Sequence, residues 1–201
     1  MARRDVSRNT NTKPVGSSRR KIMERTESRV QPASEESLNG SRPLPRNENN
    51  VLSLLRGDHE DIQSQYEGFQ TAGGDDRYFL AHRIMRELEL HNRVEEEVFY
   101  PAVRRAVERQ AHKKGAAVMR AAWQEHRNVK EHLARVKESR AQDDRLTAHI
   151  DALMQRVQRH VQTEERDLFP LAHALLGDEG LMRLRQDLRE RQEELEHRMA
   201  A

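Results

Sequence analysis

No cysteine occurs in the 201 residues, so neither a disulfide nor a thiolate metal site can contribute to this protein. Aromatic residues make up only 4% of the chain, which disfavours a sheet-rich fold. No apolar run approaches the roughly 18 residues that a membrane-spanning helix needs. The Arg3-Arg4 pair is not followed by the apolar stretch of a secretory or twin-arginine signal, so we expect cytoplasmic residence and no membrane partner. Any bound metal must be held by nitrogen and oxygen atoms.

A dominant charge of one sign is also absent. The 36 basic and 34 acidic residues leave a formal net charge of +2 at pH 7, so no overall partner of opposite charge is indicated. Residues 1–46 hold 11 of the basic and 5 of the acidic side chains and almost no periodic apolar residues. We predict a disordered basic arm there. Because this arm has no aromatic residue to stack on a base, a solvated tail is favoured over a nucleic-acid-binding one.

Apolar residues recur at the helical spacings of three and four along four segments of the chain. These stripes cover residues 52–69, 80–102, 119–136 and 146–171, and turn signals such as Gly73-Gly74 separate them. Asp75 is the expected N-cap of the second helix, and Asp143-Asp144 precede the fourth. Since short connections make neighbouring helices antiparallel, we predict an all-α, up-down-up-down four-helix bundle over residues 47–176. A weaker stripe predicts an additional short C-terminal helix over residues 177–201, which would cap the bundle or mediate self-association.

Ionisable residues interrupt all four stripes near their middle. Each stripe carries one histidine, and the second and fourth also carry a glutamate four residues later, which places His91 with Glu95 and His160 with Glu164 on one helix face. Burying an unpaired charge costs several kcal/mol against a total stability of about 5–15 kcal/mol, so six such groups would threaten the fold. Bound cations remove that conflict. The predicted metal ligands are His59, His91, Glu95, His126, His160 and Glu164.

An internal repeat strengthens the prediction. The segments HNRVEEEVFYP (residues 91–101) and HVQTEERDLFP (residues 160–170) have His, Glu, Glu and Pro at the same offsets. One isolated His-x-x-x-Glu pair is weak evidence, because such pairs are often surface contacts worth about 0.2–0.5 kcal/mol. Two copies at matching offsets, each preceded by a helix with a single histidine, indicate two hairpins related by a pseudo-twofold axis. That arrangement suits a dinuclear centre better than a single ion.

The pattern resembles the hemerythrin-like HHE cation-binding domain over about residues 49–175. The resemblance implies two iron ions, one bound by His59 and His91 and the other by His126 and His160, with Glu95 and Glu164 bridging them. It also implies open positions for a small oxidant such as O₂, NO or peroxide. His/carboxylate ligand sets accept manganese and zinc as well. Oxygen-carrying members have a second histidine on the third helix and a final aspartate; this chain has Lys130 and Glu164 at those places, which argues against reversible oxygen carriage.

Residues beside the predicted ligands are candidates for supporting roles. Four acids are candidate partners of imidazole N–H groups, with solvated surface as the alternative: Asp58, Glu96, Glu125 and Glu165. Pro101 and Pro170 lie inside helical stretches, where each should free the backbone carbonyl four residues earlier and bend the helix. Tyr66 and Trp123 lie within reach of the predicted site, and core filling is favoured over a redox role. The remaining histidines are predicted to lie on the surface or flanks: His82, His112, His132, His149, His173 and His197.

Three functional hypotheses follow. The first is a metal-binding protein that senses or handles iron, O₂, NO or peroxide, favoured because no substrate pocket or second catalytic motif is recognisable. The second is a di-iron enzyme with peroxidase, catalase-like or NO-oxidising activity. The third is a metal-free helical protein that binds a partner through residues 181–199.

Overall fold

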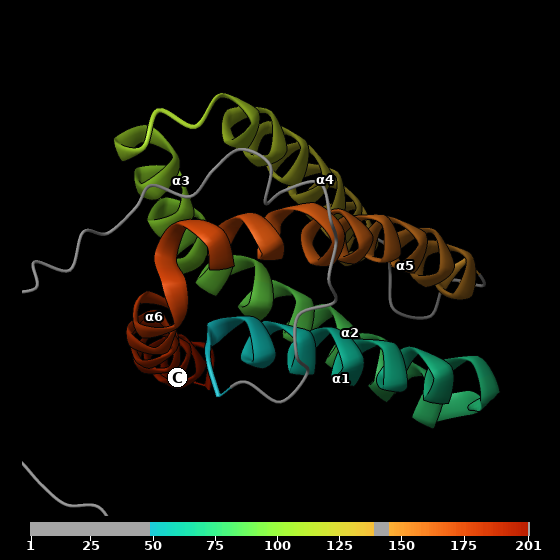
Figure 1. The fold of residues 1–201 in the computed structure, drawn as a ribbon. Helices are drawn as coiled ribbons and strands as arrows, with labels where there is room; N and C mark the ends of the chain where they lie inside the picture. Colours follow the sequence, from blue (N-terminus) through green and yellow to red (C-terminus); the bar gives the residue numbers. More distant parts are fainter. Residues whose placement is uncertain (1–48, 139–144, 201) are drawn as a thin grey trace, which may run out of the picture. The chain divides into compact units, whose positions relative to one another are not determined.

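A computed structural model describes residues 49–138 and 145–200, and all regular structure in these ranges is helical. The predicted N-terminal arm and Asp143-Asp144, which are expected to precede the fourth helix, lie outside these ranges. The four-helix bundle with an additional C-terminal helix is confirmed (Figure 1). In the described part, no helix combines the length and apolar character needed to cross a membrane.

The first hairpin consists of α1 (Val51–Thr71) and α2 (Gly74–Val94), which lie side by side (Figure 1). Asn50 caps α1, since its side chain accepts hydrogen bonds from the N–H groups of Leu52 and Ser53, and Ser53 completes a capping box. The prediction that Asp75 caps α2 is wrong. Gly74, at φ +55°, already begins the helix, so Asp75 lies in the first turn, where its charge favours the positive end of the helix dipole.

The second hairpin pairs α4 (Lys113–Glu138) with α5 (Leu146–Thr163). Beyond its second α-helix, each hairpin continues through a π-helical segment of its own into a further α-helix. In the first, α2 passes through η2 (Glu95–Phe99) into α3 (Tyr100–Arg109). In the second, α5 passes through η3 (Glu164–Leu168) into α6 (Phe169–Ala200). The internal repeat of the sequence therefore corresponds to a repeat of the backbone.

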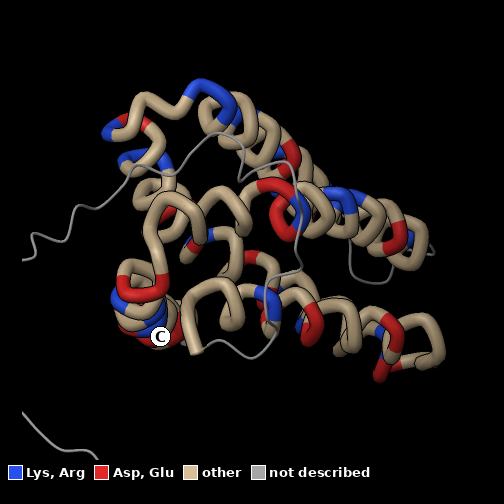
Figure 2. Tube along the Cα trace, viewed as in Figure 1, with Lys and Arg blue, Asp and Glu red and all other residues tan. Residues whose placement is uncertain are grey.

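Gly177 divides α6 into two helical parts. Its backbone is left-handed and non-helical (φ 64°, ψ 173°), a conformation that glycine adopts without a steric penalty. The chain turns there, and the C-terminal part lies beside the start of α1 (Figure 1), where Arg185 donates a hydrogen bond to the carbonyl of Asn50. Both signs of charge occur along this part (Figure 2).

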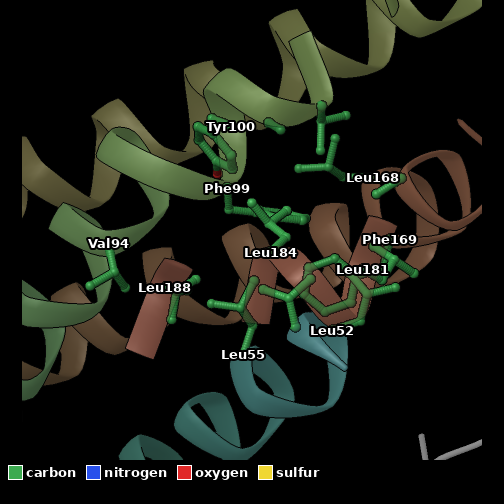
Figure 3. Packing of buried hydrophobic residues seen from close by; sticks show 14 of the residues in the cluster. Leu52, Leu55, Val94, Phe99, Tyr100, Leu168, Phe169, Leu181, Leu184 and Leu188 are labelled. Atoms are coloured by element: carbon green, nitrogen blue, oxygen red, sulfur yellow. The ribbon is translucent and has the colours of Figure 1, made fainter. Parts of the chain in front are cut away.

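The apolar stripe of the C-terminal part packs into the bundle. Leu181, Leu184, Leu188 and Leu195 are buried in a cluster with residues of α1, η2 and α3, including Leu52, Leu55, Phe99 and Tyr100 (Figure 3). The four leucines are at most 7% exposed. The stripe therefore caps the bundle of its own chain, as one of the two predictions for this segment proposed.

Candidate metal centre

A polar layer divides the core of the bundle in two. One apolar cluster contains Leu55 and Ala122, and the other contains Ile62 and Val129. On each helix of the bundle the predicted ligand histidine lies between a residue of one cluster and a residue of the other; His59 follows Leu55 and precedes Ile62 on α1. The layer is buried on all sides, and its six side chains are at most 6% exposed: His59, His91, Glu95, His126, His160 and Glu164.

The structure brings all six predicted residues together. Five of them, without His126, each offer one nitrogen or oxygen atom, and these atoms all lie within 4.8 Å of one another. His126 joins the group through Nδ1, which lies 3.4 Å from Glu95 Oε2. The histidine rings pair within hairpins, with centroids 4.9 Å apart for His59 and His91 and 5.5 Å apart for His126 and His160. This pairing agrees with the sequence expectation of two half-sites, while the role of the six residues as ligands stays a prediction.

The spacing of these atoms fits metal ions better than direct hydrogen bonds. His59 Nε2 lies 3.5 Å from Glu164 Oε2, and Glu95 Oε2 lies 3.4 and 3.5 Å from nitrogens of His91 and His160. Charged hydrogen bonds would be about 2.7–2.9 Å long, whereas two atoms that each bind one ion at about 2.1 Å lie about 3.0–3.4 Å apart. Each of the six side chains also presents at least one buried nitrogen or oxygen without a hydrogen-bond partner among the described residues. Buried polar atoms are rarely left in that state unless something binds them. The cluster therefore suits metal binding.

The π-helical segments place the two glutamates. Glu95 and Glu164 are each the first residue of such a segment, and each accepts a backbone hydrogen bond from the residue five positions later, Tyr100 and Phe169 respectively. A proline follows directly, at positions 101 and 170, and has no N–H to donate. The sequence predicted an α-helix bent by a lost hydrogen bond at each proline. The chain instead widens the turn before the proline, a feature common at functional sites.

Outer carboxylates contact three of the four histidines. His59 Nδ1 lies 3.0 Å from Glu165 Oε1, and His126 Nε2 lies 3.2 Å from Glu96 Oε1. Each of these acids directly follows a buried glutamate in the chain and reaches a histidine of the other hairpin. Asp58 lies 3.5 Å from His91 Nδ1. Such partners fix the ring orientation and strengthen a histidine as a ligand.

Glu125, the fourth predicted partner, does not contact a histidine. Its carboxylate accepts a hydrogen bond from Asn128 on the same helix. Of the two readings, the surface one therefore fits Glu125: it matches Asp58 in the sequence repeat, but Asp58 lies beside His91 whereas Glu125 lies beside Asn128. Nδ1 of His160 accordingly has no hydrogen-bond partner among the described residues.

Tyr100 is a site residue that the sequence analysis did not single out. Its side chain is fully buried, and its hydroxyl donates a 2.6 Å hydrogen bond to Glu164 Oε1. Its ring lies against Trp123 and His126, at centroid distances of 4.9 and 5.2 Å. The repeat could have indicated a special role for Tyr100, because Tyr100 and Phe169 occupy the same offset and only Tyr100 has a hydroxyl.

Burial and mutual contacts shift the pKa values of the cluster strongly. Burial lowers the pKa of His59, but its contacts with Glu164 and Glu165 outweigh burial and raise it from 6.5 to about 10. Burial acts on His91 in the same way, and Glu95 and Asp58 raise its pKa overall. Burial would raise the pKa of Glu95, but His91, His126 and His160 hold it well below its usual value. Burial, together with Glu164 and Glu95, raises the pKa of Tyr100 well above 10, so its hydroxyl keeps the proton it donates. Without a metal, these shifts favour protonated imidazoles at His59 and His91 and an ionised carboxylate at Glu95.

The other residues considered from the sequence lie outside the cluster. Tyr66 directs its hydroxyl to Asp151, at 2.9 Å, and packs on Phe69, which fits core filling. Trp123 contacts the edge of the site through Tyr100 and lies 6.0 Å from the ring of His126. Lys130 forms an ion pair with Glu96 at 2.7 Å and is half-exposed. None of the six remaining histidines is buried: His82, His112, His132, His149, His173 and His197.

A groove of about 360 Å³ approaches the site from outside. It is lined by side chains of α1, α2 and the C-terminal part of α6, among them Asp58, Gln65, Arg83 and Gln192, and His91 forms part of its wall. The inner nitrogen and oxygen atoms of the six side chains are themselves buried from solvent.

Comparison with known proteins agrees with this architecture. Residues 50–172 match the family described as Hemerythrin HHE cation binding domain. An uncharacterized hemerythrin-like protein of Schizosaccharomyces pombe is 28% identical over 123 residues, which is 61% of this chain and 59% of the yeast protein. This chain therefore spans about three fifths of that relative's length. A crystal structure of a hemerythrin HHE cation binding domain-containing protein from Mycobacterium kansasii superposes with a TM-score of 0.60 at 23% identity, covering 72% of this chain and 86% of that one, and shows the shared fold.

Proposed function

The chain belongs to the hemerythrin HHE cation binding domain family, and we propose that it binds a pair of iron ions and uses them to sense or handle a small oxidant. The proposed ligands are His59, His91, Glu95, His126, His160 and Glu164. The observation that carries the proposal is the buried layer itself, in which six side chains converge and each keeps a bare nitrogen or oxygen atom. Bound iron would supply redox change and open coordination positions for the oxidant.

The residues around the cluster support this use. Glu165, Glu96 and Asp58 hold three of the histidines by their outer nitrogens, which fixes how the inner nitrogens are presented. A groove lies beside His91, and the close packing of the buried layer favours a small ligand, such as O₂, NO or peroxide. Lys130 is tied to Glu96 at the place where oxygen carriers of the family have a further histidine, so we do not propose reversible oxygen transport.

An anaerobic titration with ferrous iron tests the proposal. We expect about two iron ions per chain, with His160→Ala reducing the bound iron and the thermal stability together, because bound metal adds to the free energy of unfolding. His132→Ala is the matched control, since His132 bonds to the carbonyl of Asn128 on its own helix, away from the layer. Failure of the native protein to retain iron would refute the proposal.

Enzymatic turnover is a second candidate, because Lys130 in place of a histidine leaves one nitrogen ligand fewer beside His126. Peroxide consumption and NO oxidation by the iron-loaded protein distinguish the two uses. Turnover that Glu95→Gln abolishes would establish an enzyme, whereas stoichiometric binding without turnover favours a sensor. The metal-free interaction hypothesis is less favoured, because the leucines of its proposed contact surface, Leu181, Leu184, Leu188 and Leu195, pack into the bundle of the same chain.

A further inference from the structure

The two buried glutamates have different hydrogen-bond surroundings. Both oxygens of Glu95 lack a hydrogen-bond partner among the described residues. Only Oε2 of Glu164 is bare in this way, because Oε1 accepts the 2.6 Å hydrogen bond from Tyr100. Both glutamates are 0% exposed, so water does not remove the difference.

The difference originates in one position of the repeat. Tyr100 directly follows η2, and Phe169 directly follows η3. Phe169 has no hydroxyl, and its ring stacks on His59 at 6.0 Å with an interplanar angle of 7°. Tyr100 of the first copy therefore donates a hydrogen bond to Glu164 of the second copy, whereas Phe169 has no hydroxyl to donate to Glu95.

We propose that Tyr100 is a positioning residue that makes the two carboxylates of the centre unequal: both oxygens of Glu95 are bare, whereas one oxygen of Glu164 is already held by the Tyr100 hydroxyl. The inference rests on the metal function proposed above. A short O–H···O⁻ bond in a buried site is roughly twice as strong as a neutral one. It occupies one lone pair of Oε1 and withdraws electron density from it, so Oε1 is a weaker donor to a cation than a bare oxygen. An ion held by the bare Oε2 of Glu164 would meet no competing donor, whereas an ion that needs Oε1 would share that oxygen with Tyr100. The two steps of metal binding would therefore differ in affinity.

The pair Tyr100→Phe and Tyr66→Phe tests this role. Both substitutions remove one phenolic hydroxyl that donates to a carboxylate, but Tyr66 donates to Asp151, outside the layer. Anaerobic calorimetric titration with ferrous iron gives the two dissociation constants, and Mössbauer spectra of ⁵⁷Fe-loaded protein report whether the two ions have equal surroundings. In Tyr100→Phe we expect the ratio of the two dissociation constants to fall about tenfold, the effect of 1.4 kcal/mol, and the two Mössbauer doublets to converge. Tyr66→Phe should leave both measurements as in the native protein.

The outcomes separate this role from the metal function itself. A native protein that binds iron, with the ratio and the doublets unchanged in Tyr100→Phe, would overturn the role of Tyr100 and leave the metal function standing. A native protein that binds no iron would overturn both. Thermal unfolding of the metal-free variants shows that a change in iron binding does not come from a lost fold. A change of equal size in Tyr66→Phe would assign the effect to general stability and refute the positioning role.

Discussion

The two copies of the repeat share a backbone and differ in their surroundings. Each copy places a buried glutamate at the start of a π-helical segment and then an acid that reaches a histidine of the other hairpin. Only the first copy ends in a tyrosine, and its outer acid, Glu96, is tied to Lys130. The positions of the buried glutamates and outer acids are therefore duplicated, while the hydrogen bonds around them are not. The two half-sites should therefore be alike in composition and unequal in strength.

The largest expected effect comes from removing either central carboxylate. Glu95→Gln should weaken iron binding by more than about 100-fold, since even outer partners of metal ligands are worth 10–100-fold. Glu164→Gln should weaken binding less, because one of its oxygens already serves Tyr100. Metal content after dialysis, measured by mass spectrometry, ranks the two variants. Glu97→Gln is the control, since Glu97 lies in the same turn as Glu95 but pairs with Arg191 outside the layer. Equal losses of iron in Glu95→Gln and Glu164→Gln would contradict the proposed difference between the two carboxylates.

Outer carboxylates should give the next largest effect. Glu165→Gln removes the charged partner of His59, and we expect iron affinity to fall about 10–100-fold. Glu125→Gln should leave the affinity unchanged, because Glu125 contacts Asn128 and no histidine. Competition with a chelator of known affinity gives both values. A fall of similar size in Glu125→Gln would show that the sequence repeat describes the outer partners better than the structure does.

The pH dependence of the metal-free protein should reveal the charge pairs of the layer. The pKa of His59 is about 10 in the folded chain and near 6.5 when unfolded, so its contribution is fully present below pH 6.5 and is lost as pH rises towards 10. The lowered pKa of Glu95 has the opposite sign: its contribution is present above about pH 4.5 and is lost in acid. Thermal unfolding in chelator should therefore show a melting temperature that declines from pH 6.5 to 10. In Glu165→Gln the folded pKa of His59 should be lower, so the decline should still begin near pH 6.5 but should be smaller and end at lower pH. A curve flat to pH 10 in the native protein would contradict this.

Lys130 should give the smallest effect. The pair with Glu96 is half-exposed on the lysine side, so Lys130→Ala should cost no more than about 1 kcal/mol of unfolding free energy. Glu96 stays 3.2 Å from His126, and iron content should be kept. Lys137→Ala, which breaks a similar pair with Glu89, is the matched control for denaturant unfolding. Loss of iron in Lys130→Ala alone would show that the lysine supports the first copy of the repeat.

Much of this arrangement could be predicted from the sequence, because helical periodicity decides which face a residue occupies. His59 and Ile62 lie on one apolar stripe, so their burial followed from spacing alone. The contacts between hairpins could not be predicted in this way. Glu165 and Glu125 both adjoin a candidate ligand, yet only Glu165 meets a histidine, since the rotation of neighbouring helices decides which side chains face each other. The π-helical segments escaped prediction because proline indicates a missing hydrogen bond without specifying how the preceding turn adjusts.

The closed character of the polar layer has a kinetic consequence. The inner nitrogen and oxygen atoms of the layer are buried from solvent, so an ion bound to them could not leave through a permanent channel. Loading and release then depend on how often the helices part, which makes the residence time of a metal a property of the fold's local opening. We expect the rate of amide hydrogen exchange along α1 and α5 to be set by the same local openings of the helices. The rate at which a bound metal exchanges would then be set by the rate at which the helices open locally.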